Sequence, residues 1–287
     1  MKIMFSLYII FVMPLTIFAQ NIKGIVVDSI TNKPLAYVNV GVVNSSFGCI
    51  TNTNGLYQLK LDKKVDALSF VRYSMLGYDD KIIALSKAFQ LDSIYLQKKD
   101  IMLDEVILTN KSFSKKKKFG TKKKSKHGIC GWGGNKFGSG HEIGLAINLG
   151  KKESKIEKLK INIYNHSYKN SLLRLHIRDL KDGLPNNEIL NKNILIPINK
   201  KSGWVTVDLS KENIIISGKI VLTVEWISAK AVVRKRVIAV NKQKTPSILI
   251  YTNRKQGELF IRKGSELPWR KINNQSPNMY IEVKQEF

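Results

Sequence analysis

Apolar and polar residues alternate one by one along most of this chain, whereas the three-to-four-residue spacing of an amphipathic helix is almost absent. In the segment AYVNVGV, residues 36–42, the three valines fall on one side and Tyr37, Asn39 and Gly41 on the other. An extended strand with one buried face requires this placement of side chains. The pattern therefore predicts an all-β protein.

The first part of the chain, residues 20–110, contains seven short segments of this kind, separated by turn-forming residues. Asn32 and Pro34 break the chain after the first segment, and the dipeptide Asn54-Gly55 is typical of a tight turn. The last two segments are DSIYLQ and LDEVILT, the latter at 103–109. Seven short strands in about ninety residues favour a β-sandwich.

The stretch KGIVVDSITNKPLAYVNVGVVNSSFGCITNTNGLYQLKL resembles the carboxypeptidase-regulatory-like domain, a transthyretin-like Greek-key sandwich. The residues that match the family pattern are Gly24, Val26, Asp28, Pro34, Leu35, Val38, Val40, Thr51, Asn52, Gly55 and Tyr57. LDEVILT looks like the strand that ends this domain in TonB-dependent outer-membrane receptors, but no plug or barrel sequence follows, so we expect no transporter. The resemblance implies a fold and no particular activity, because this domain is an accessory unit attached to many different partners.

The N-terminus is predicted to be an export signal. Lys2 precedes an apolar run over residues 3–18, and Ala19 is the small residue expected before a cleavage site. The alternative, an anchor helix, needs about 20 unbroken apolar residues, whereas Pro14 interrupts this shorter run. We therefore predict a signal peptide at 1–19 and a mature protein in the periplasm, on the outer-membrane surface or outside the cell.

Residues 111–128 differ sharply in composition from what precedes them, with nine lysines and no acidic residue between 111 and 126. Because the segment lacks apolar periodicity and its like charges repel, a disordered or extended linker is predicted. The alternative is contact with an anionic membrane or polymer. The lysines that would make this contact are Lys115, Lys116, Lys117, Lys118, Lys122, Lys123 and Lys124.

The formal net charge of +26 is concentrated in the later part of the chain. Residues 21–110 carry ten basic and nine acidic side chains, whereas 127–287 carry 28 and 13. A basic domain attracts nucleic acid, anionic lipid or acidic glycans. Because an exported protein meets little nucleic acid, we expect none as a partner and predict an envelope glycan or protein. The alternative is a lysine-rich surface that is simply solvated.

Residues 129–287 again alternate and predict a second sandwich of the jelly-roll type. EKLKINIYN, SLLRLHIRDL and GWVTVDLS set apolar residues against polar ones, while KIVLTVEWIS and SILIYT are apolar enough to be central strands. No motif in this half is strong enough to indicate a family. The predicted organisation is thus two β-sandwich domains joined by a lysine-rich linker.

Residues typical of catalysis or metal binding do not form a recognisable motif. His127 and Cys130 have a metal-like spacing, but no second pair follows. His141 and Glu142 are adjacent, unlike the His-x-x-Glu of zinc carboxypeptidases, and the common hydrolase and phosphate-loop motifs do not occur. We predict no enzyme, no metal and no cofactor. Cys49 and Cys130 either pair across a long loop or remain two free thiols.

Binding is the function class that the sequence favours, because aromatic faces pack on the C–H surfaces of sugars. Trp204 alternates opposite the apolar face of its strand, Trp269 lies in a loop, and Trp226 is predicted to be core. Arg174, His176 and Arg178 alternate against leucine and isoleucine and are predicted to face solvent. The five candidate residues for a glycan site are Trp204, Trp269, Arg174, His176 and Arg178. The alternative for Trp204 is packing on a sheet edge or on the first domain.

The sequence as a whole favours an exported, non-catalytic accessory protein of the cell envelope. It would bind a glycan or an envelope protein through its basic C-terminal domain. The alternatives are a structural scaffold that docks on partner proteins and an uncharacterised hydrolase.

Overall fold

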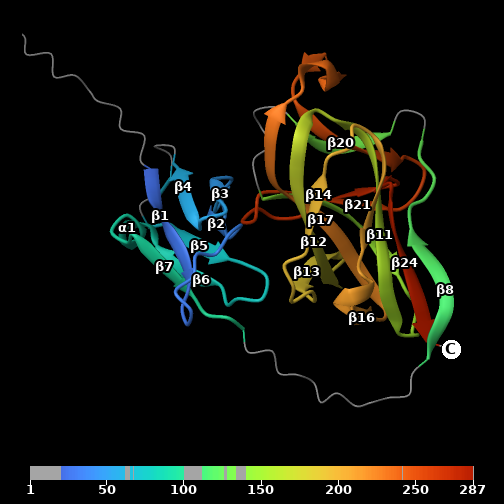
Figure 1. Ribbon diagram of the computed structural model, residues 1–287, viewed down its shortest axis with the longest axis horizontal. Helices are drawn as coiled ribbons and strands as arrows, with labels where there is room; N and C mark the ends of the chain where they lie inside the picture. The colour runs from blue at the N-terminus through green and yellow to red at the C-terminus, as the bar shows by residue number, and fades with distance from the viewer. Residues whose placement is uncertain are drawn as a thin grey trace, which may run out of the picture.

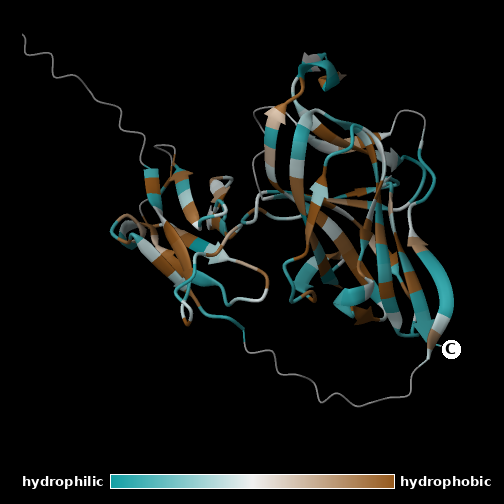
Figure 2. Ribbon diagram, viewed as in Figure 1, coloured by the Kyte–Doolittle hydropathy of each residue, from teal (hydrophilic) through white to brown (hydrophobic). Residues whose placement is uncertain are grey.

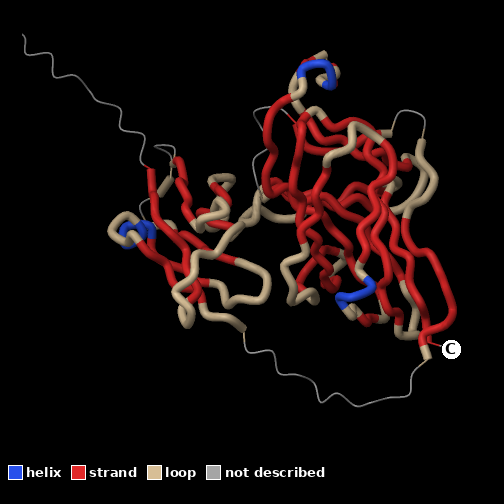
Figure 3. The backbone as a smooth tube through the Cα atoms, viewed as in Figure 1, coloured by secondary structure: helices blue, strands red, loops and turns tan. Residues whose placement is uncertain are grey.

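The structure, a computed structural model, describes residues 21–61, 65–66, 68–99, 112–125, 128–133, 140–240 and 242–286. The predicted signal peptide at 1–19 and the predicted strand at 103–109 lie outside the described residues. The described chain consists almost wholly of strands, arranged in two β-sandwich domains (Figures 1 and 3). The prediction of an all-β, two-sandwich protein is therefore confirmed.

The first sandwich is formed by two small sheets. Its elements are β1 (Asn21–Asp28), β2 (Asn39–Val42), β3 (Gly48–Ile50), β4 (Leu56–Lys60), β5 (Phe70–Ser74), β6 (Lys81–Ala84), the helical turn α1 (Leu85–Ala88) and β7 (Ser93–Leu96). The sheets have the orders β4-β1-β7 and β3-β2-β5-β6, with β1 antiparallel to β4 and parallel to β7. Val38, Val40 and Val42 are buried in the core between the sheets, as the alternation predicts.

The residues that match the family pattern shape the turns of this sandwich. The carboxylate of Asp28 accepts hydrogen bonds from the Thr31 amide at 2.8 Å and from the Tyr78 hydroxyl at 2.9 Å. These bonds lower the pKa of Asp28 to about 2. The buried hydroxyl of Thr51 donates to the carbonyl of Leu35 at 2.7 Å. These residues form the hydrogen bonds of the turns, which accounts for their types without a binding site.

The second sandwich consists of two larger sheets. The seven-stranded sheet contains β13 (Leu184–Glu188), β12 (Tyr168–Lys181), β17 (Lys219–Val232), β10 (His141–Asn148), β21 (Glu258–Lys263), β22 (Arg270–Asn273) and β14 (Leu195–Ile198), the first six in that spatial order. The eight-stranded sheet contains β23 (Ser276–Pro277), β20 (Ser247–Asn253), β11 (Ser154–His166), β24 (Met279–Glu286) and β8 (Phe113–Gly120) in that order, with β15 (Gly203–Asp208), β16 (Ile215–Ile216) and β9 (Ile129–Gly133) at its sides. The short elements η1 (Ser210–Glu212), η2 (Arg234–Arg236), β18 (Ala239–Val240) and β19 (Gln243–Lys244) complete the described chain.

The inward faces of the two large sheets share one hydrophobic core. Leu175 of β12, Leu222 of β17 and Leu159 of β11 are fully buried in it, and Trp226 is buried as predicted. Hydrophobic and hydrophilic positions alternate along these strands in Figure 2, so each sheet also has a polar outer side. The first domain lies against the polar side of the seven-stranded sheet, whereas the polar side of the eight-stranded sheet is open to solvent. Each of these two sides carries a group of candidate functional residues.

The prediction of a disordered or extended linker at 111–128 is wrong for residues 113–120, which form β8, a strand of the second sandwich. This strand pairs antiparallel with β24 and is the edge of the eight-stranded sheet (Figure 1). Phe119 packs against the core, and Lys118 forms an ion pair with Glu282 at 3.1 Å. The lysines are compatible with a strand because side chains on an edge strand remain in water, where like charges cost little, while the backbone gains its hydrogen bonds from β24.

Candidate functional site

A row of four charged residues crosses the polar side of the seven-stranded sheet. In register on β12, β17, β10 and β21 lie Arg174, Glu225, Glu142 and Arg262. Directly opposed residues on neighbouring strands share one face, so the pairing places two carboxylates side by side with an arginine at each end. Both glutamates are fully buried. A buried charge persists only when it is paired and hydrogen-bonded, so the arginines are required by the burial.

Glu142 is bound by groups from three other strands. Arg178 approaches it with both terminal nitrogens, at 2.6 and 3.3 Å, and a terminal nitrogen of Arg262 donates to the same carboxylate. The hydroxyl of Thr223 donates to the same carboxylate at 2.7 Å. Burial by itself would raise the pKa of Glu142, but the guanidinium groups of Arg178 and Arg262 hold it well below its usual range. Glu142 is therefore ionised.

His176 lies between two carboxylates. Its Nδ1 is 2.8 Å from Glu188 and its Nε2 is 2.9 Å from Glu225. Each ring nitrogen is within hydrogen-bond distance of a carboxylate, to which an imidazolium would donate, and the Nδ1 is also 3.1 Å from a terminal nitrogen of Arg178. Burial lowers the pKa of His176, and so does the neighbouring positive charge of Arg178. The negative charges of Glu142 and Glu188 outweigh both effects, so the pKa is raised above its ordinary value.

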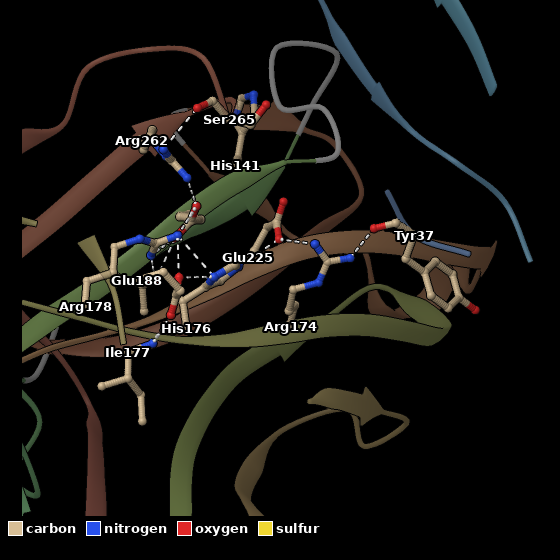
Figure 4. Close-up of polar contacts among 12 residues, drawn as sticks. Tyr37, His141, Arg174, His176, Ile177, Arg178, Glu188, Glu225, Arg262 and Ser265 are labelled. Carbon is tan, nitrogen blue, oxygen red and sulfur yellow. Dashed lines mark hydrogen bonds and ion pairs between the residues drawn. The ribbon is translucent and has the colours of Figure 1, made fainter. Parts of the chain in front are cut away.

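Arg174 links this charged row to the first domain. One terminal nitrogen lies 3.3 Å from Glu225, and the other donates a hydrogen bond to the backbone carbonyl of Tyr37 (Figure 4). Tyr37 has a φ of 65°, a left-handed conformation that is rare and strained for an aromatic residue. The arginine thus holds the carbonyl of a strained turn at the junction between the domains.

A second contact joins the domains at Glu266, in the loop after β21. Its carboxylate lies 3.5 Å from Arg72 of β5. A side chain on Gly41 of β2 would place its Cβ only 2.6 Å from the Glu266 Cγ. Gly41 therefore permits the close approach of the two domains. Burial raises the pKa of Glu266 against the opposing effect of Arg72.

The prediction that Arg174, His176 and Arg178 face solvent is wrong. Their exposed fractions are only 1%, 4% and 6%. They do alternate away from the core of their own sandwich, as predicted, but the first domain and the loop with Trp269 lie against that side. The ring centre of Trp269 lies 5.4 Å from the guanidinium carbon of Arg178 and 4.8 Å from that of Arg262.

Trp204 does not join the other four predicted residues. It lies on β15, on the polar side of the eight-stranded sheet, and its ring meets Tyr280 of β24 edge-to-face with centres 5.1 Å apart. Two lysines flank this pair: Lys118 lies 5.8 Å from the Tyr280 ring centre, and Lys160 is the cross-strand neighbour of Tyr280. The five-residue site predicted from the sequence is thus divided between two opposite sheets.

The aromatic residues of this outer side continue across the sheet. Tyr164 of β11 packs edge-to-face on Tyr251 of β20 at 5.0 Å, and the Nζ of Lys124 lies 3.8 Å from the Tyr251 ring centre. Trp204, Tyr280, Tyr164 and Tyr251 all remain partly or substantially exposed. We call them, with Lys118, Lys124 and Lys160, the basic aromatic face.

The lysines of the predicted linker occupy defined places on or beside this sheet. Lys115, Lys116, Lys117 and Lys118 belong to β8, and Lys122, Lys123 and Lys124 follow it in an extended segment; all seven are exposed. In β8, Lys118 is opposite Glu282 on the outer side, while Lys117 is opposite the core residue Val283. The sheet therefore fixes where the lysines of β8 lie, and only some of them are on its outer side.

Several residues of the charged row and its surroundings were not predicted from the sequence. Glu188, Glu225 and Arg262 were not singled out, and Glu142 was considered only as a metal ligand beside His141, although single charged residues within apolar runs indicate burial with a partner. Glu225 in KIVLTVEWIS is the clearest case. The alternation shows that Arg174 and Glu225 point away from the core, but the partner strand and the covering domain come only from the tertiary structure.

Residues with metal-binding or redox chemistry are not grouped in the described chain. No set of three histidine, cysteine, aspartate or glutamate side chains within the described ranges is placed to hold a metal ion. His127 lies outside those ranges. Cys49 and Cys130 are free thiols, and burial raises the pKa of each to about 12. Neither is therefore ionised at neutral pH.

Comparison with known proteins identifies the first sandwich. Residues 22–108 match the family model of the CarboxypepD_reg-like domain, which confirms the resemblance seen in the sequence. The chain therefore carries a domain of this class, followed by a second sandwich that no family model matches. No curated protein matches the chain.

Two solved structures share a distant likeness with the whole chain. One contains the cysteine protease and lectin-like domains of Cwp84, a surface layer associated protein of Clostridium difficile, with 10% identity, a TM-score of 0.38, and coverage of 87% of this chain and 58% of that one. The other is a variant of the same clostridial protease after propeptide cleavage, with 12% identity, a TM-score of 0.41, and coverage of 91% and 61%. The chain thus spans about three fifths of the length of these two chains. No helix within the described ranges is long and apolar enough to span a membrane.

Proposed function

We propose that this protein is an exported, non-catalytic accessory protein of the cell envelope that binds an anionic glycan on the basic aromatic face. The observation that carries the proposal is the Trp204–Tyr280 pair with Lys118 and Lys160 beside it. The predicted signal peptide and the accessory character of CarboxypepD_reg-like domains support the same function.

The aromatic pairs suit sugar rings, because pyranose C–H groups pack on aromatic faces. Trp204 and Tyr280 form one pair, and Tyr164 and Tyr251 form the other. A chain of sugars lying along β11 would pass over both pairs, because Trp204 and Tyr280 are opposite Asn162 and Lys160 of β11 and Tyr164 follows further along the same strand. A flat sheet with several exposed rings binds an extended polymer better than a small molecule, because each contact is weak and the contacts add.

The lysines suit an acidic polymer rather than a neutral one. Lys118 has a 53% exposed side chain, and Lys124 is exposed above the Tyr251 ring. Glu282, the nearest acidic partner of Lys118, is itself opposite a second lysine, Lys158. Surface charges of this kind attract anions from solution, and the attraction weakens with salt because the Debye length falls to about 8 Å at physiological ionic strength.

The test is retention of the purified mature protein by acidic polysaccharides in affinity electrophoresis. We expect binding to polygalacturonate or alginate and none to neutral glucans. The binding should be weaker at 0.5 M salt than at 0.05 M by about tenfold or more. Trp204→Ala and Tyr280→Ala should each weaken binding about fivefold, the effect of losing roughly 1 kcal/mol of aromatic contact. Lys118→Gln with Lys160→Gln should lower the salt dependence.

The matched controls lie away from this face. Trp269→Ala removes a tryptophan from the loop beside the other sheet, and Lys33→Gln with Lys87→Gln removes two charges from the first domain. These variants should bind as the wild type does. Equal losses in the controls, or binding to anionic lipid vesicles in place of polysaccharides, would reject the glycan proposal; in the second case the same face would serve as a membrane contact.

A further inference from the structure

The end of β17 and the segment that follows it, up to β20, project beyond one end of the second sandwich (Figures 1 and 3). This segment contains the short element η2 and the strands β18 and β19, in which Ala239 is opposite Lys244 and Val240 is opposite Gln243. We call its described residues, 230–240 and 242–244, the basic hairpin. The basic aromatic face and the charged row do not include any of these residues.

The basic hairpin is strongly cationic. Residues 228–246 include six lysines and arginines and no aspartate or glutamate. Five of the six cations are exposed, and none of the five forms an ion pair with another described residue. They are Lys230, Arg234, Lys235, Lys242 and Lys244. A cluster of like charges that has no counter-charge among the described residues attracts anions from its surroundings.

The sixth cation, Arg236, fixes the base of the hairpin. Its guanidinium donates a hydrogen bond to the Tyr168 carbonyl at 3.1 Å, and its own carbonyl accepts hydrogen bonds from the Asn165 amide group at 2.9 Å and the Ser167 hydroxyl at 3.1 Å. The backbone amide of Val233 also donates to the Ser167 carbonyl, at 2.8 Å. The base is thus bonded to the turn between β11 and β12, so little conformational freedom remains there to be lost on binding.

Apolar side chains lie among the exposed cations. Val232 is 47% exposed, Ala231 and Ala239 are exposed, and Val237 and Ile238 are partly exposed. Hydrophobic and hydrophilic residues accordingly follow one another closely in the projecting hairpin of Figure 2. This combination suits a lipid surface, because cations contact the head groups while apolar side chains enter the boundary with the acyl chains.

The hairpin lacks the aromatic side chains of a sugar-binding site. Residues 228–246 include no phenylalanine, tyrosine or tryptophan, so the hairpin offers no ring to stack on a sugar. An exposed valine also gains nothing from a soluble polyanion, which remains hydrated, whereas burial in a lipid interface removes its apolar surface from water. The composition therefore favours a membrane over an acidic glycan as the partner.

We propose that the basic hairpin attaches the protein reversibly to the surface of a membrane that contains anionic phospholipids. The five exposed cations contact the phosphates of the head groups, and Val232 enters the interface with its apolar neighbours. Each basic residue near such a surface strengthens binding about fivefold. The proposal does not depend on the glycan site, because the two sites use different residues.

The experiment is co-sedimentation of the full mature chain with vesicles of phosphatidylcholine, either alone or mixed with phosphatidylglycerol. We expect binding to the mixed vesicles only, and an affinity about tenfold or more lower at 0.5 M salt than at 0.05 M. The triple variant Arg234→Gln, Lys235→Gln, Lys242→Gln should weaken binding on the order of a hundredfold. Val232→Ser should weaken it about threefold, because only the exposed part of this side chain is available for burial.

A depth measurement separates insertion from adsorption by charge alone. Ala239→Trp adds a fluorescent side chain at an exposed position of β18. Lipids that are brominated in their acyl chains should quench the fluorescence of this variant more strongly than that of the wild type. Equal quenching of the two proteins would show that the apolar side chains stay outside the bilayer, and would overturn the proposed insertion.

Matched controls test whether the hairpin itself is responsible. The triple variant Lys33→Gln, Lys87→Gln, Lys98→Gln removes the same number of charges from exposed positions of the first domain, and should bind the mixed vesicles nearly as the wild type does. Trp204→Ala should keep vesicle binding and lose polysaccharide retention, whereas the hairpin triple variant should do the reverse. The proposal is overturned if the wild type does not bind the mixed vesicles, or if both triple variants lose binding equally. It is also overturned if the hairpin variant loses polysaccharide retention instead of vesicle binding, because the hairpin then belongs to the glycan site.

Discussion

The two polar sides of the C-terminal sandwich are built from the same alternating pattern but carry different cations. The side covered by the first domain uses arginine, with Arg174 and Arg178 almost fully buried against carboxylates. The open side uses lysine, with Lys118 and Lys124 exposed to solvent. The planar guanidinium forms several fixed hydrogen bonds and is weakly hydrated, whereas the ammonium group is strongly hydrated. The type of cation therefore distinguishes a docked sheet face from a solvated one.

The comparison extends to the acidic partners. Glu142 and Glu225 on the covered side are fully buried, and their pKa values are lowered by arginine against the effect of burial. Glu282 on the open side is partly exposed and pairs with a lysine that remains half in water. Removal of one partner should thus be costly on the covered side and nearly neutral on the open side.

The sharpest test of this comparison is Glu142→Gln. The substitution keeps the shape of the side chain but leaves Arg178 and Arg262 without their shared counter-charge. We expect a loss of about 3–5 kcal/mol in the free energy of unfolding, the usual effect of breaking a buried ion pair from one side. Urea denaturation followed by tryptophan fluorescence measures it.

The matched variant on the open side is Glu282→Gln. Its expected effect is below about 1 kcal/mol, because Lys118 can be solvated by water. Equal losses for the two variants would show that burial does not separate the two faces.

A smaller effect is expected at the domain junction from Gly41→Ala. The added Cβ would come within 2.6 Å of the Glu266 Cγ, so the Glu266 side chain or the loop that carries it must shift. Overpacking of this kind costs about 1–3 kcal/mol. Glu266→Ala in the same chain should restore most of the loss, and the double-mutant cycle measures the coupling between the two domains. Additive effects would contradict direct contact between Gly41 and Glu266.

The pH dependence of stability tests the imidazolium of His176. Because its pKa is raised in the folded protein, its contribution is complete below the unfolded value of about 6.5 and declines as pH rises through the folded value. The difference in unfolding free energy between the wild type and His176→Gln should therefore shrink as pH rises above about 6.5. His141 and His166 have lowered pKa values from burial and titrate with the opposite sign, so only this difference isolates His176. A difference that grows with pH would show that the ring is neutral.

The sequence predicted which side chains share a face but not what covers that face. The alternation correctly separated Leu175 from His176, and the family resemblance correctly identified the first sandwich. Neither could show that Arg174 meets the carbonyl of Tyr37, because that contact joins residues 137 positions apart in the chain. Composition also misjudged β8, since a lysine-rich segment can form an edge strand when its neighbour supplies the hydrogen bonds.

The smallest expected effect on stability concerns that edge. Lys117 of β8 is opposite the core residue Val283, so it lies on the core-facing side of an edge strand. A charged side chain in this position opposes pairing of the edge strand with a second sheet. Lys117→Val should change the unfolding free energy by no more than about 0.5 kcal/mol. It should nevertheless increase self-association at high protein concentration, measured by sedimentation velocity. Lys123→Val, in the extended segment beyond β8, is the matched control and should remain as dispersed as the wild type. If both variants associate equally, lost net charge rather than the protected strand edge explains the effect, because each substitution removes one positive charge.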